Sequence, residues 1–356
     1  MMKETSTVLK AFIVLSLIAL LAFTCGCTGQ GQATDSGTRV VTDMAGREVV
    51  IPKNIDSIVT IGSVPVLNSF MFIMGKGDKI ANNLPDSFIK QGKWKYQYAI
   101  EPGLKNKPTI QPAGGEINIE ELMKINPDVV FTMERGQVET LEKNDITVIY
   151  LSWADAEDVK GLMRVLGGIF DEQERAERYV RYFDEATARP GKVVASLPDD
   201  QRPKVLFCNY NSMSAGLKIS DWWIEKAGGI AVAKNKRVAE SMTFDLEQLL
   251  AWDPDVIILF NPEQTAPVRN DTRLSGVSAI KNGNVYAAPM GAHYWCQRTS
   301  ETPLMVLWTA KTIYPELFKD LDMEAEVVTF YKEFYNCEIT RDQAAEILSG
   351  TAKINQ

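Results

Sequence analysis

One segment of the sequence occurs twice. Residues 117–133 (INIEELMKINPDVVFTM) align without a gap with residues 244–260 (FDLEQLLAWDPDVIILF), and five of the 17 positions are identical. Each copy has apolar residues at helical spacing, then a proline, then a β-branched apolar run typical of a buried strand. The repeat therefore predicts two related α/β units in one chain. The identical pairs are Glu120/Glu247, Leu122/Leu249, Pro127/Pro254, Asp128/Asp255 and Val129/Val256.

The two copies carry the same helix start and stop signals. In the first copy, Asn118 can cap a helix that has Glu121 at its third position. That helix is expected to stop at Asn126, because the residue before a proline avoids the helical region. The equivalent residues of the second copy are Asp245, Gln248 and Asp253.

The remaining pattern alternates strands and helices. Further buried strands are predicted at 56–62, 147–151, 204–208 and 284–287. A charged, helix-favouring segment over 171–197 lies between the two copies, and it predicts a long helix that kinks or ends at Pro190. We therefore predict an α/β fold with two Rossmann-like lobes, residues 39–165 and 203–356, joined by a single long α-helix within 166–202.

The N-terminal residues are not expected to belong to either lobe. Two lysines precede an apolar run at 11–24, which is shorter than the roughly 20 residues that span a bilayer and is typical of a signal-peptide core. A cysteine after a small residue, followed by a Gly/Ser/Thr/Gln-rich stretch, resembles a prokaryotic lipoprotein signal. We predict a signal peptide at 1–26, lipidation of Cys27 with Cys25 as the alternative, and a flexible linker at 27–38. An uncleaved N-terminal anchor is the competing interpretation.

Composition excludes several classes of function. The net charge of −8 and the pI of about 5.0 argue against a nucleic-acid partner, because a protein that binds phosphates needs a basic surface. The chain has one histidine, which disfavours direct capture of free zinc or manganese. Only three cysteines follow Cys27, so no disulfide framework is expected. We predict no cofactor and no metal held by protein side chains.

The start of the first lobe resembles a known family. Residues 39–62 contain the pattern D-x-x-G-R-x-V-x-I-P, with Asp43 as its first residue and Pro52 as its last. The pattern is similar to the opening of the iron-chelate and vitamin B12 class of ABC-transporter substrate-binding proteins. This resemblance implies two α/β lobes bridged by a stiff helix. It also implies a monomer at the extracytoplasmic face of the membrane, which delivers a small solute to a dimeric ABC permease.

The resemblance also implies a role for the two matching glutamates. In the vitamin B12 member an acidic residue on each lobe binds arginine pockets of the permease, and the matching positions here are Glu120 and Glu247. A permease with two-fold symmetry needs two equivalent acidic contacts, which a duplicated lobe supplies. The alternative is local, because any carboxylate in the first turn of a helix gains about 0.3–1 kcal/mol from the helix dipole.

Loops at the carboxyl ends of the predicted strands are expected to bind the solute. Three consecutive rings precede an arginine in the last of these loops, and such a surface suits a planar or anionic chelate. At least one of the three rings is expected to be buried. The predicted ligand-binding residues are Asn83, Met133, Arg135, Trp153, Tyr210, His293, Tyr294, Trp295 and Arg298.

The expected solute is a metal chelate, with a ferric siderophore-type complex as the first expectation. The organic part of such a complex already saturates the iron, which fits a chain with one histidine. Haem, cobalamin, molybdate and tungstate remain alternatives. Cobalamin is disfavoured because Asn82 or Asn83, Gly114, Met133 and Ser241 stand where the vitamin B12 member has aromatic residues.

The sequence contains no recognisable catalytic motif. The patterns G-x-S-x-G, G-x-x-x-x-G-K-[ST], G-x-G-x-x-G and H-E-x-x-H are all absent. An extracellular hydrolase would have to use His293, which lies in a loop without a nucleophile elbow. We therefore predict a binding protein and not an enzyme. The hydrolase and a tethered scaffold without a small ligand are the alternatives from other classes.

Overall fold

The two copies of the repeat fold in the same way in the computed structural model, which describes residues 37–112 and 115–351. Helix α4 (Ile119–Ile125) begins at Asn118, whose side chain accepts a hydrogen bond of 3.0 Å from the backbone N–H of Glu121. Helix α9 (Leu246–Trp252) begins at Asp245, which accepts from Gln248 N–H at 2.7 Å. Both predicted caps are confirmed.

Both repeated helices end at a left-handed residue before the proline, with φ of 49° at Asn126 and 42° at Asp253. The repeated aspartate then holds the start of the neighbouring strand. The Asp128 carboxylate accepts from Ser57 N–H at 2.9 Å, and the Asp255 carboxylate accepts from Lys204 N–H at 2.8 Å. The repeat thus encodes one structural unit, made of a capped helix, a turn and a strand tied to its neighbour.

Two parallel sheets follow from this unit. The first sheet has the order β3-β4-β5 and the second has the order β11-β10-β6-β8. The register is the same in both, since Val129 lies opposite Ile58 and Val256 lies opposite Val205. All residues of β4 and β10 are buried, as expected for parallel strands covered on both faces. The strands are β3 (Ile58–Ile61), β4 (Val129–Thr132), β5 (Val148–Tyr150), β6 (Lys204–Cys208), β8 (Ile230–Ala231), β10 (Val256–Leu259) and β11 (Val285–Ala287).

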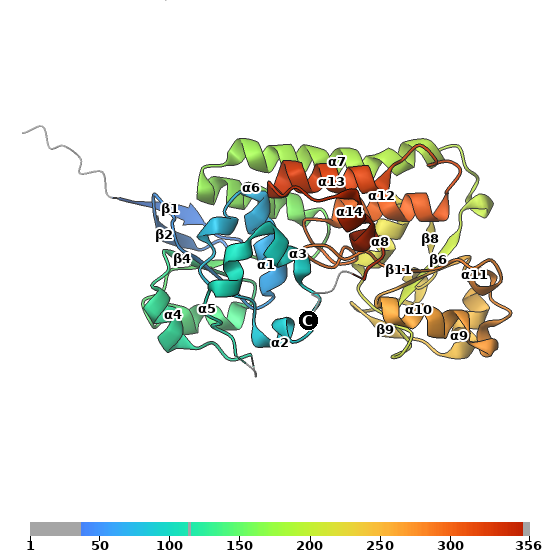
Figure 1. Ribbon diagram of the computed structural model, residues 1–356, viewed down its shortest axis with the longest axis horizontal. Coiled ribbons are helices and arrows are strands. Elements are labelled where there is room, and N and C mark those ends of the chain that lie inside the picture. The colour runs from blue at the N-terminus through green and yellow to red at the C-terminus, as the bar shows by residue number, and fades with distance from the viewer. Residues whose placement is uncertain (1–36, 113–114, 352–356) are drawn as a thin grey trace, which may run out of the picture. The chain divides into compact units, whose positions relative to one another are not determined.

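Helices surround each sheet, and Figure 1 shows the two groups at opposite ends of α7. We call the first sheet with α1–α6 the N-terminal lobe, and the second sheet with α8–α12 the C-terminal lobe. No helix in the described ranges is both long and apolar enough to cross a membrane. The N-terminal helices are α1 (Val64–Ile73), α2 (Asp86–Ile89), α3 (Lys95–Ile100), α4, α5 (Arg135–Glu142) and α6 (Asp158–Phe170). The C-terminal helices are α8 (Ile219–Lys226), α9, α10 (Thr265–Arg269), α11 (Ser278–Lys281) and α12 (Thr302–Ile313).

The D-x-x-G-R pattern forms the turn of a small antiparallel hairpin between β1 (Thr38–Thr42) and β2 (Glu48–Pro52). The Asp43 carboxylate accepts from the backbone N–H of Arg47 at 3.0 Å and from its Nε at 2.9 Å. It also accepts from Tyr150 N–H at 3.1 Å, which ties the hairpin to β5. Gly46 has a φ of 76°, a conformation that a side chain would strain. The pattern is therefore a structural device of the N-terminal lobe. A second short hairpin in the C-terminal lobe pairs β7 (Ser214–Ala215) with β9 (Met242–Thr243).

The predicted connecting helix is α7 (Gln173–Val194), which spans the distance between the two sheets (Figure 1). The helix was predicted to kink or to end at Pro190, and it does not end there, because Pro190 lies inside it and is buried. A kink at Pro190 stays a prediction. Proline has no backbone N–H, so one helical hydrogen bond is missing at Pro190. The position lies close to the C-terminal end of α7, where only a few further helical hydrogen bonds could be disturbed. Burial of its ring helps to offset that loss.

A second connection between the lobes comes from helices α13 (Met323–Tyr335) and α14 (Arg341–Leu348). The Tyr96 hydroxyl of α3 donates to the Glu346 carboxylate of α14 at 2.9 Å, and Lys95 forms an ion pair with the same carboxylate at 2.6 Å. Arg175 at the start of α7 donates to the Phe334 carbonyl at 3.0 Å. The end of the described chain therefore packs against the N-terminal lobe, which the sequence did not indicate.

Candidate ligand-binding gap between the lobes

A hollow of about 850 Å³ is lined by residues of both lobes. Its N-terminal wall is the segment 155–158, which follows β5. Its C-terminal wall comes from 218–225 and from 234–240, the latter following β8. Ligands of open α/β sheets bind beyond the carboxyl ends of the strands, and small-molecule sites typically have volumes of about 300–1,000 Å³. We call this hollow the inter-lobe gap and treat it as the candidate site.

The inter-lobe gap is acidic. Six carboxylates line it against three cationic side chains. Four of the six carboxylates are paired, namely Asp221 with Arg237 at 2.8 Å, Glu225 with Lys234 at 2.6 Å, Glu157 with Lys160 at 2.6 Å and Glu240 with Arg298 at 2.8 Å, which leaves Asp155 and Asp158 against Lys218. The lining therefore favours a neutral or cationic ligand over an anionic one. The charged lining residues are Asp155, Glu157, Asp158, Asp221, Glu225 and Glu240 with Lys218, Lys234 and Arg237.

Two predicted site residues from different lobes meet beside this gap. The indole N–H of Trp153 donates to the carbonyl of Arg298 at 3.0 Å. The Trp153 ring is half-buried and packs edge-on against Phe70, with ring centroids 5.4 Å apart. The structure thus brings Trp153 and Arg298 together, although they are 145 residues apart in sequence.

The guanidinium of Arg298 is already occupied. Its two terminal nitrogens donate to the two carboxylate oxygens of Glu240 at 2.8 and 3.1 Å. The Arg298 side chain is only 17% exposed, whereas that of Glu240 is 51% exposed. The guanidinium of Arg298 is thus paired with a carboxylate of the protein itself, and its predicted contact with a ligand stays a prediction. Glu240 was not among the residues predicted from the sequence, because nothing local marks a glutamate that pairs with an arginine 58 positions later.

A buried ion pair fixes the segment that carries Glu240. Arg237 donates to the Asp221 carboxylate, to the Ala215 carbonyl at 2.8 Å and to the Glu240 carbonyl at 3.2 Å. The Arg237 and Asp221 side chains are 3% and 9% exposed. Burial raises the pKa of Asp221, while its hydrogen bond with Arg237 opposes that rise. The backbone at Glu240 is thus held in place without help from the Glu240 side chain.

The three-ring loop is turned inward. His293 is 5% exposed, and its ring lies 5.4 Å from that of Trp94 in the N-terminal lobe. Trp295 is fully buried. The expectation that at least one ring would be buried is confirmed, and the prediction that Trp295 and His293 present a stacking surface is corrected. Tyr294 is half-buried and stacks on Phe260, with centroids 4.8 Å apart.

A buried carboxylate explains the inward turn. Glu301 is fully buried and accepts hydrogen bonds from His293 N–H at 2.8 Å and from the Tyr331 hydroxyl at 2.8 Å. A longer bond of 3.3 Å comes from Ala292 N–H. Gly291 has no space for a side chain, because an added Cβ would lie 2.2 Å from Glu301 Oε1. Burial raises the pKa of Glu301 to about 7 and lowers the pKa of His293 to about 4.

None of the nine predicted ligand-binding residues is among those that line the inter-lobe gap, and four of them lie elsewhere within a single lobe. The Asn83 side chain accepts from Tyr98 OH at 2.9 Å inside the N-terminal lobe, and Met133 is half-buried against the core. Arg135 lines a small hollow built from the N-terminal lobe alone. The Tyr210 hydroxyl donates to Asp271 at 2.5 Å, and the Tyr210 side chain lines a hollow of the C-terminal lobe. The loops were correctly placed near strand ends, but these side chains point to different surfaces.

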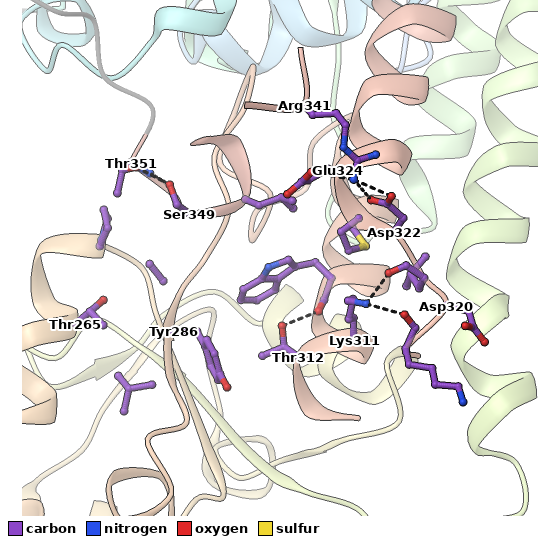
Figure 2. A pocket seen from close by; sticks show the side chains of 18 of the residues that line it. Thr265, Tyr286, Lys311, Thr312, Asp320, Asp322, Glu324, Arg341, Ser349 and Thr351 are labelled. Atoms are coloured by element: carbon purple, nitrogen blue, oxygen red, sulfur yellow. Dashed lines mark hydrogen bonds and ion pairs between the residues drawn. The ribbon is translucent and has the colours of Figure 1, made fainter. Parts of the chain in front are cut away.

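A hollow of about 840 Å³ lies beside β11, α12 and α14, and none of the predicted site residues lines it. Figure 2 shows Lys311 at its edge, with the ammonium directed to backbone carbonyls. That ammonium donates to Phe318 O at 3.1 Å and to Leu321 O at 2.6 Å. Arg341 is likewise paired with Asp322 at 2.8 Å, so these two cations are occupied within the protein.

The two repeated glutamates are exposed. Glu120 and Glu247 each occupy the second position of their helices, α4 and α9. Within residues 37–112 and 115–351, neither carboxylate has a hydrogen-bond or ion-pair partner. In the same ranges no group of three or more His, Cys, Asp or Glu residues is arranged to hold a metal ion.

Two parallel sheets that face a common gap and are joined by α7 define a two-lobed α/β solute-binding protein. The chain belongs to the periplasmic binding protein family, which matches residues 85–290, more than half of its length. Its fold is that of the class III binding proteins of ABC transporters. Proteins of this family bind small molecules, work with ABC permeases and are not enzymes. Its relatives are periplasmic or otherwise extracytoplasmic.

Two curated relatives bind different solutes. The molybdate-binding protein MolA of Haemophilus influenzae is 22% identical over 370 residues, which cover 95% of this chain and 99% of MolA. The iron(3+)-hydroxamate-binding protein YxeB of Bacillus subtilis is 26% identical over 191 residues, which cover 52% of this chain and 55% of YxeB.

Solved structures show the same fold. A periplasmic solute-binding protein of Veillonella parvula matches with a TM-score of 0.76 and 26% identity, over 90% of this chain and 99% of that chain. Haemophilus influenzae MolA bound to molybdate matches with a TM-score of 0.72 and 21% identity, over 85% of this chain and 99% of that chain.

Proposed function

We propose that this protein captures a ferric hydroxamate-type chelate, neutral or cationic, in the inter-lobe gap and delivers it to an ABC permease. The observation that carries the proposal is the volume and the charge of the inter-lobe gap. The gap has a volume of about 850 Å³ and is lined by six carboxylates and three cationic side chains. Three hydroxamate groups neutralise Fe³⁺, so any further ammonium makes the complex cationic. Such a ligand fits an acidic wall.

The absence of a protein metal cluster in residues 37–112 and 115–351 is compatible with this ligand. The organic part of the chelate saturates the iron, so recognition depends on shape, hydrogen bonds and charge. Trp222 lines the gap and offers a half-buried ring, and Trp153 offers a second ring beside the gap. Similarity to YxeB supports the same class of solute, although it extends over only 52% of this chain.

An oxyanion such as molybdate is the second candidate, favoured by the similarity to MolA over 95% of this chain. Arg298 would be its natural partner, because a guanidinium fork matches two oxygens of an oxyanion. However, that fork is filled by Glu240, and the cations that line the gap are outnumbered by carboxylates. Haem is less compatible, because His293 and Trp295 are buried and offer no stacking surface.

A tryptophan fluorescence titration tests the proposal. The probes are the ferric complex of desferrioxamine B, ferrichrome, molybdate, tungstate and haem, each added to the chain that begins after residue 36. The proposal predicts saturable binding of at least one ferric hydroxamate and at least about 100-fold weaker binding of molybdate, a difference of about 2.7 kcal/mol. Saturable binding of molybdate with no response to either ferric chelate would show that the oxyanion is the solute.

We further propose that the protein is anchored by a lipid on Cys27, after removal of residues 1–26. Both the signal peptide and Cys27 lie outside the described residues, as does the linker up to residue 36. The division into lobes at 39–165 and 203–356 with a connection at 166–202 likewise stays a proposal. Replacement of Cys27 by Ala is expected to release the protein from membranes, and Cys25→Ala serves as the control that distinguishes the two cysteines.

A further inference from the structure

We propose that Glu240 is a specificity-determining residue of the inter-lobe gap, which excludes anionic solutes by occupying the guanidinium of Arg298. This inference rests on the proposed function, because it explains why the inter-lobe gap binds a metal chelate in preference to an oxyanion.

Arg298 and Glu240 form a bidentate pair. Both terminal nitrogens of Arg298 donate to the two carboxylate oxygens of Glu240, at 2.8 and 3.1 Å. This bidentate arrangement is the one by which arginine recognises carboxylates and phosphates, including those of ligands. The Glu240 carboxylate therefore occupies the position that an oxyanion would take at this guanidinium.

Arg298 is mostly buried, whereas Glu240 is half exposed. The Arg298 side chain is 17% exposed, and its Nε is buried with no hydrogen-bond partner among the residues that the structure describes, so the cation has little access to water. An arginine in such a place needs a counter-charge, because an unpaired charge away from water is costly. Glu240 is the accessible member of the pair, at 51% exposure, and it lines the inter-lobe gap. An incoming anion would have to displace Glu240 in order to reach Arg298.

Backbone hydrogen bonds hold both partners of the pair in place. The Glu240 carbonyl accepts from Arg237, whose own ion pair with Asp221 is almost completely buried. On the other side, the Arg298 carbonyl accepts from Trp153 of the N-terminal lobe. The backbone positions of both partners are thus fixed independently of the Glu240–Arg298 contact. A change of the Glu240 side chain is expected to alter the charge of the site without unfolding the loop.

The test compares Glu240→Gln with Glu225→Gln. Glu225 also lines the gap and pairs with an exposed lysine, Lys234, at 2.6 Å. Each variant removes one negative charge from the gap, but only Glu240→Gln uncovers a mostly buried arginine. Affinity for molybdate and for ferric desferrioxamine B is measured by isothermal titration calorimetry on both variants and on the parent protein.

We expect Glu240→Gln to bind molybdate at least about tenfold more tightly than the parent protein, which corresponds to about 1.4 kcal/mol. For Glu225→Gln the expected gain in affinity for molybdate is less than about threefold, since this variant changes only the overall electrostatic field of the gap. Both variants are expected to bind the cationic chelate a few-fold more weakly. The double variant Glu240→Gln/Arg298→Gln is expected to lose the gain for molybdate.

Two results would overturn the inference. One is no gain for molybdate in Glu240→Gln, although the variant keeps the parent melting temperature and still binds the chelate. The other is an equal gain in Glu225→Gln, which would make the effect one of net charge. If the parent protein binds no ferric chelate but Glu240→Gln alone gains molybdate affinity, the proposed function fails and this inference stands.

Discussion

The side-chain amide of Gln97, on α3 of the N-terminal lobe, donates a hydrogen bond of 2.7 Å to the carbonyl of Ala292, in the loop that precedes α12. Gln97 is fully buried, and its amide oxygen accepts from Asn68 at 3.1 Å. Asn68 in turn accepts from the Thr60 hydroxyl of β3 at 2.8 Å. A buried chain of polar side chains therefore runs from the first sheet to the three-ring loop and helps to fix the spacing of the lobes.

Replacement of Gln97 by Leu is expected to lower the free energy of unfolding by about 2–3 kcal/mol, because it leaves the Ala292 carbonyl and the Asn68 amide buried without partners. Chemical denaturation checks this value. Gln91→Leu at an exposed position is the control and is expected to change stability by less than about 0.5 kcal/mol. Equal free energies of unfolding for the two variants would show that this row of buried polar side chains does not help to hold the lobes together.

The pH dependence of stability is expected to reflect His293. Burial lowers its pKa from 6.5 to about 4, so the folded state holds the neutral ring while the unfolded state takes up a proton. The stability associated with the neutral ring is present above pH 6.5 and is lost as the pH falls towards 4. His293→Phe keeps a ring against Trp94 and removes the titration.

The measurement is the difference in unfolding free energy between His293→Phe and the parent protein. It is expected to shift in favour of the variant by up to about 1.4 kcal/mol for each pH unit from 6.5 towards 4. Glu301 titrates with the opposite sign, because its raised pKa makes its contribution fall as the pH rises towards 7. Glu301 is present in both proteins, so its contribution cancels in the difference. A difference that does not vary with pH would mean that His293 stays charged or is exposed.

Trp222 is expected to report ligand binding. Its half-buried ring lines the inter-lobe gap, and the Lys226 ammonium lies 5.7 Å from the ring centroid. Trp222→Phe should remove most of the fluorescence change caused by a ferric chelate, which quenches nearby indoles. Trp252→Phe is the matched control, because Trp252 packs against Phe244 inside the C-terminal lobe. A loss of signal only in the control would place the ligand elsewhere.

The exposed carboxylates of Glu120 and Glu247 are expected to contact the permease. The double variant Glu120→Lys/Glu247→Lys should abolish uptake of the chelate by whole cells and keep the affinity for the chelate within about twofold. Glu316→Lys/Glu338→Lys is the control with the same change of charge at other exposed positions. Unchanged uptake in the first double variant would favour the local interpretation, in which both glutamates only stabilise their helices.

The sequence predicted those parts of the fold whose signals are local. Asn118 and Asp245 cap their helices as expected, and the residues before Pro127 and Pro254 end them, because caps and proline effects act within a few residues. The second link through α13 and α14 was missed, since the contact of Tyr96 with Glu346 has no signature in either segment.

The candidate site was predicted less completely for the same reason. Trp153 and Arg298 were both selected, and the structure joins them. The three rings were interpreted as a binding surface because aromatic side chains in a loop usually have a ligand or a core to cover. In the folded protein the rings cover a core, because the buried carboxylate of Glu301 accepts a hydrogen bond from the loop backbone and so holds the loop inward. Glu240 is equally hidden in the sequence, since only the folded chain places it on Arg298.

Native mass spectrometry of the chain without its first 36 residues, mixed with equal amounts of ferric desferrioxamine B and molybdate, tests the central claim most directly. The account predicts one chelate per chain, with iron and its organic ligand both retained in the added mass. A complex that contains only molybdenum, or a chain that stays free at chelate concentrations that saturate other binding proteins, would contradict it.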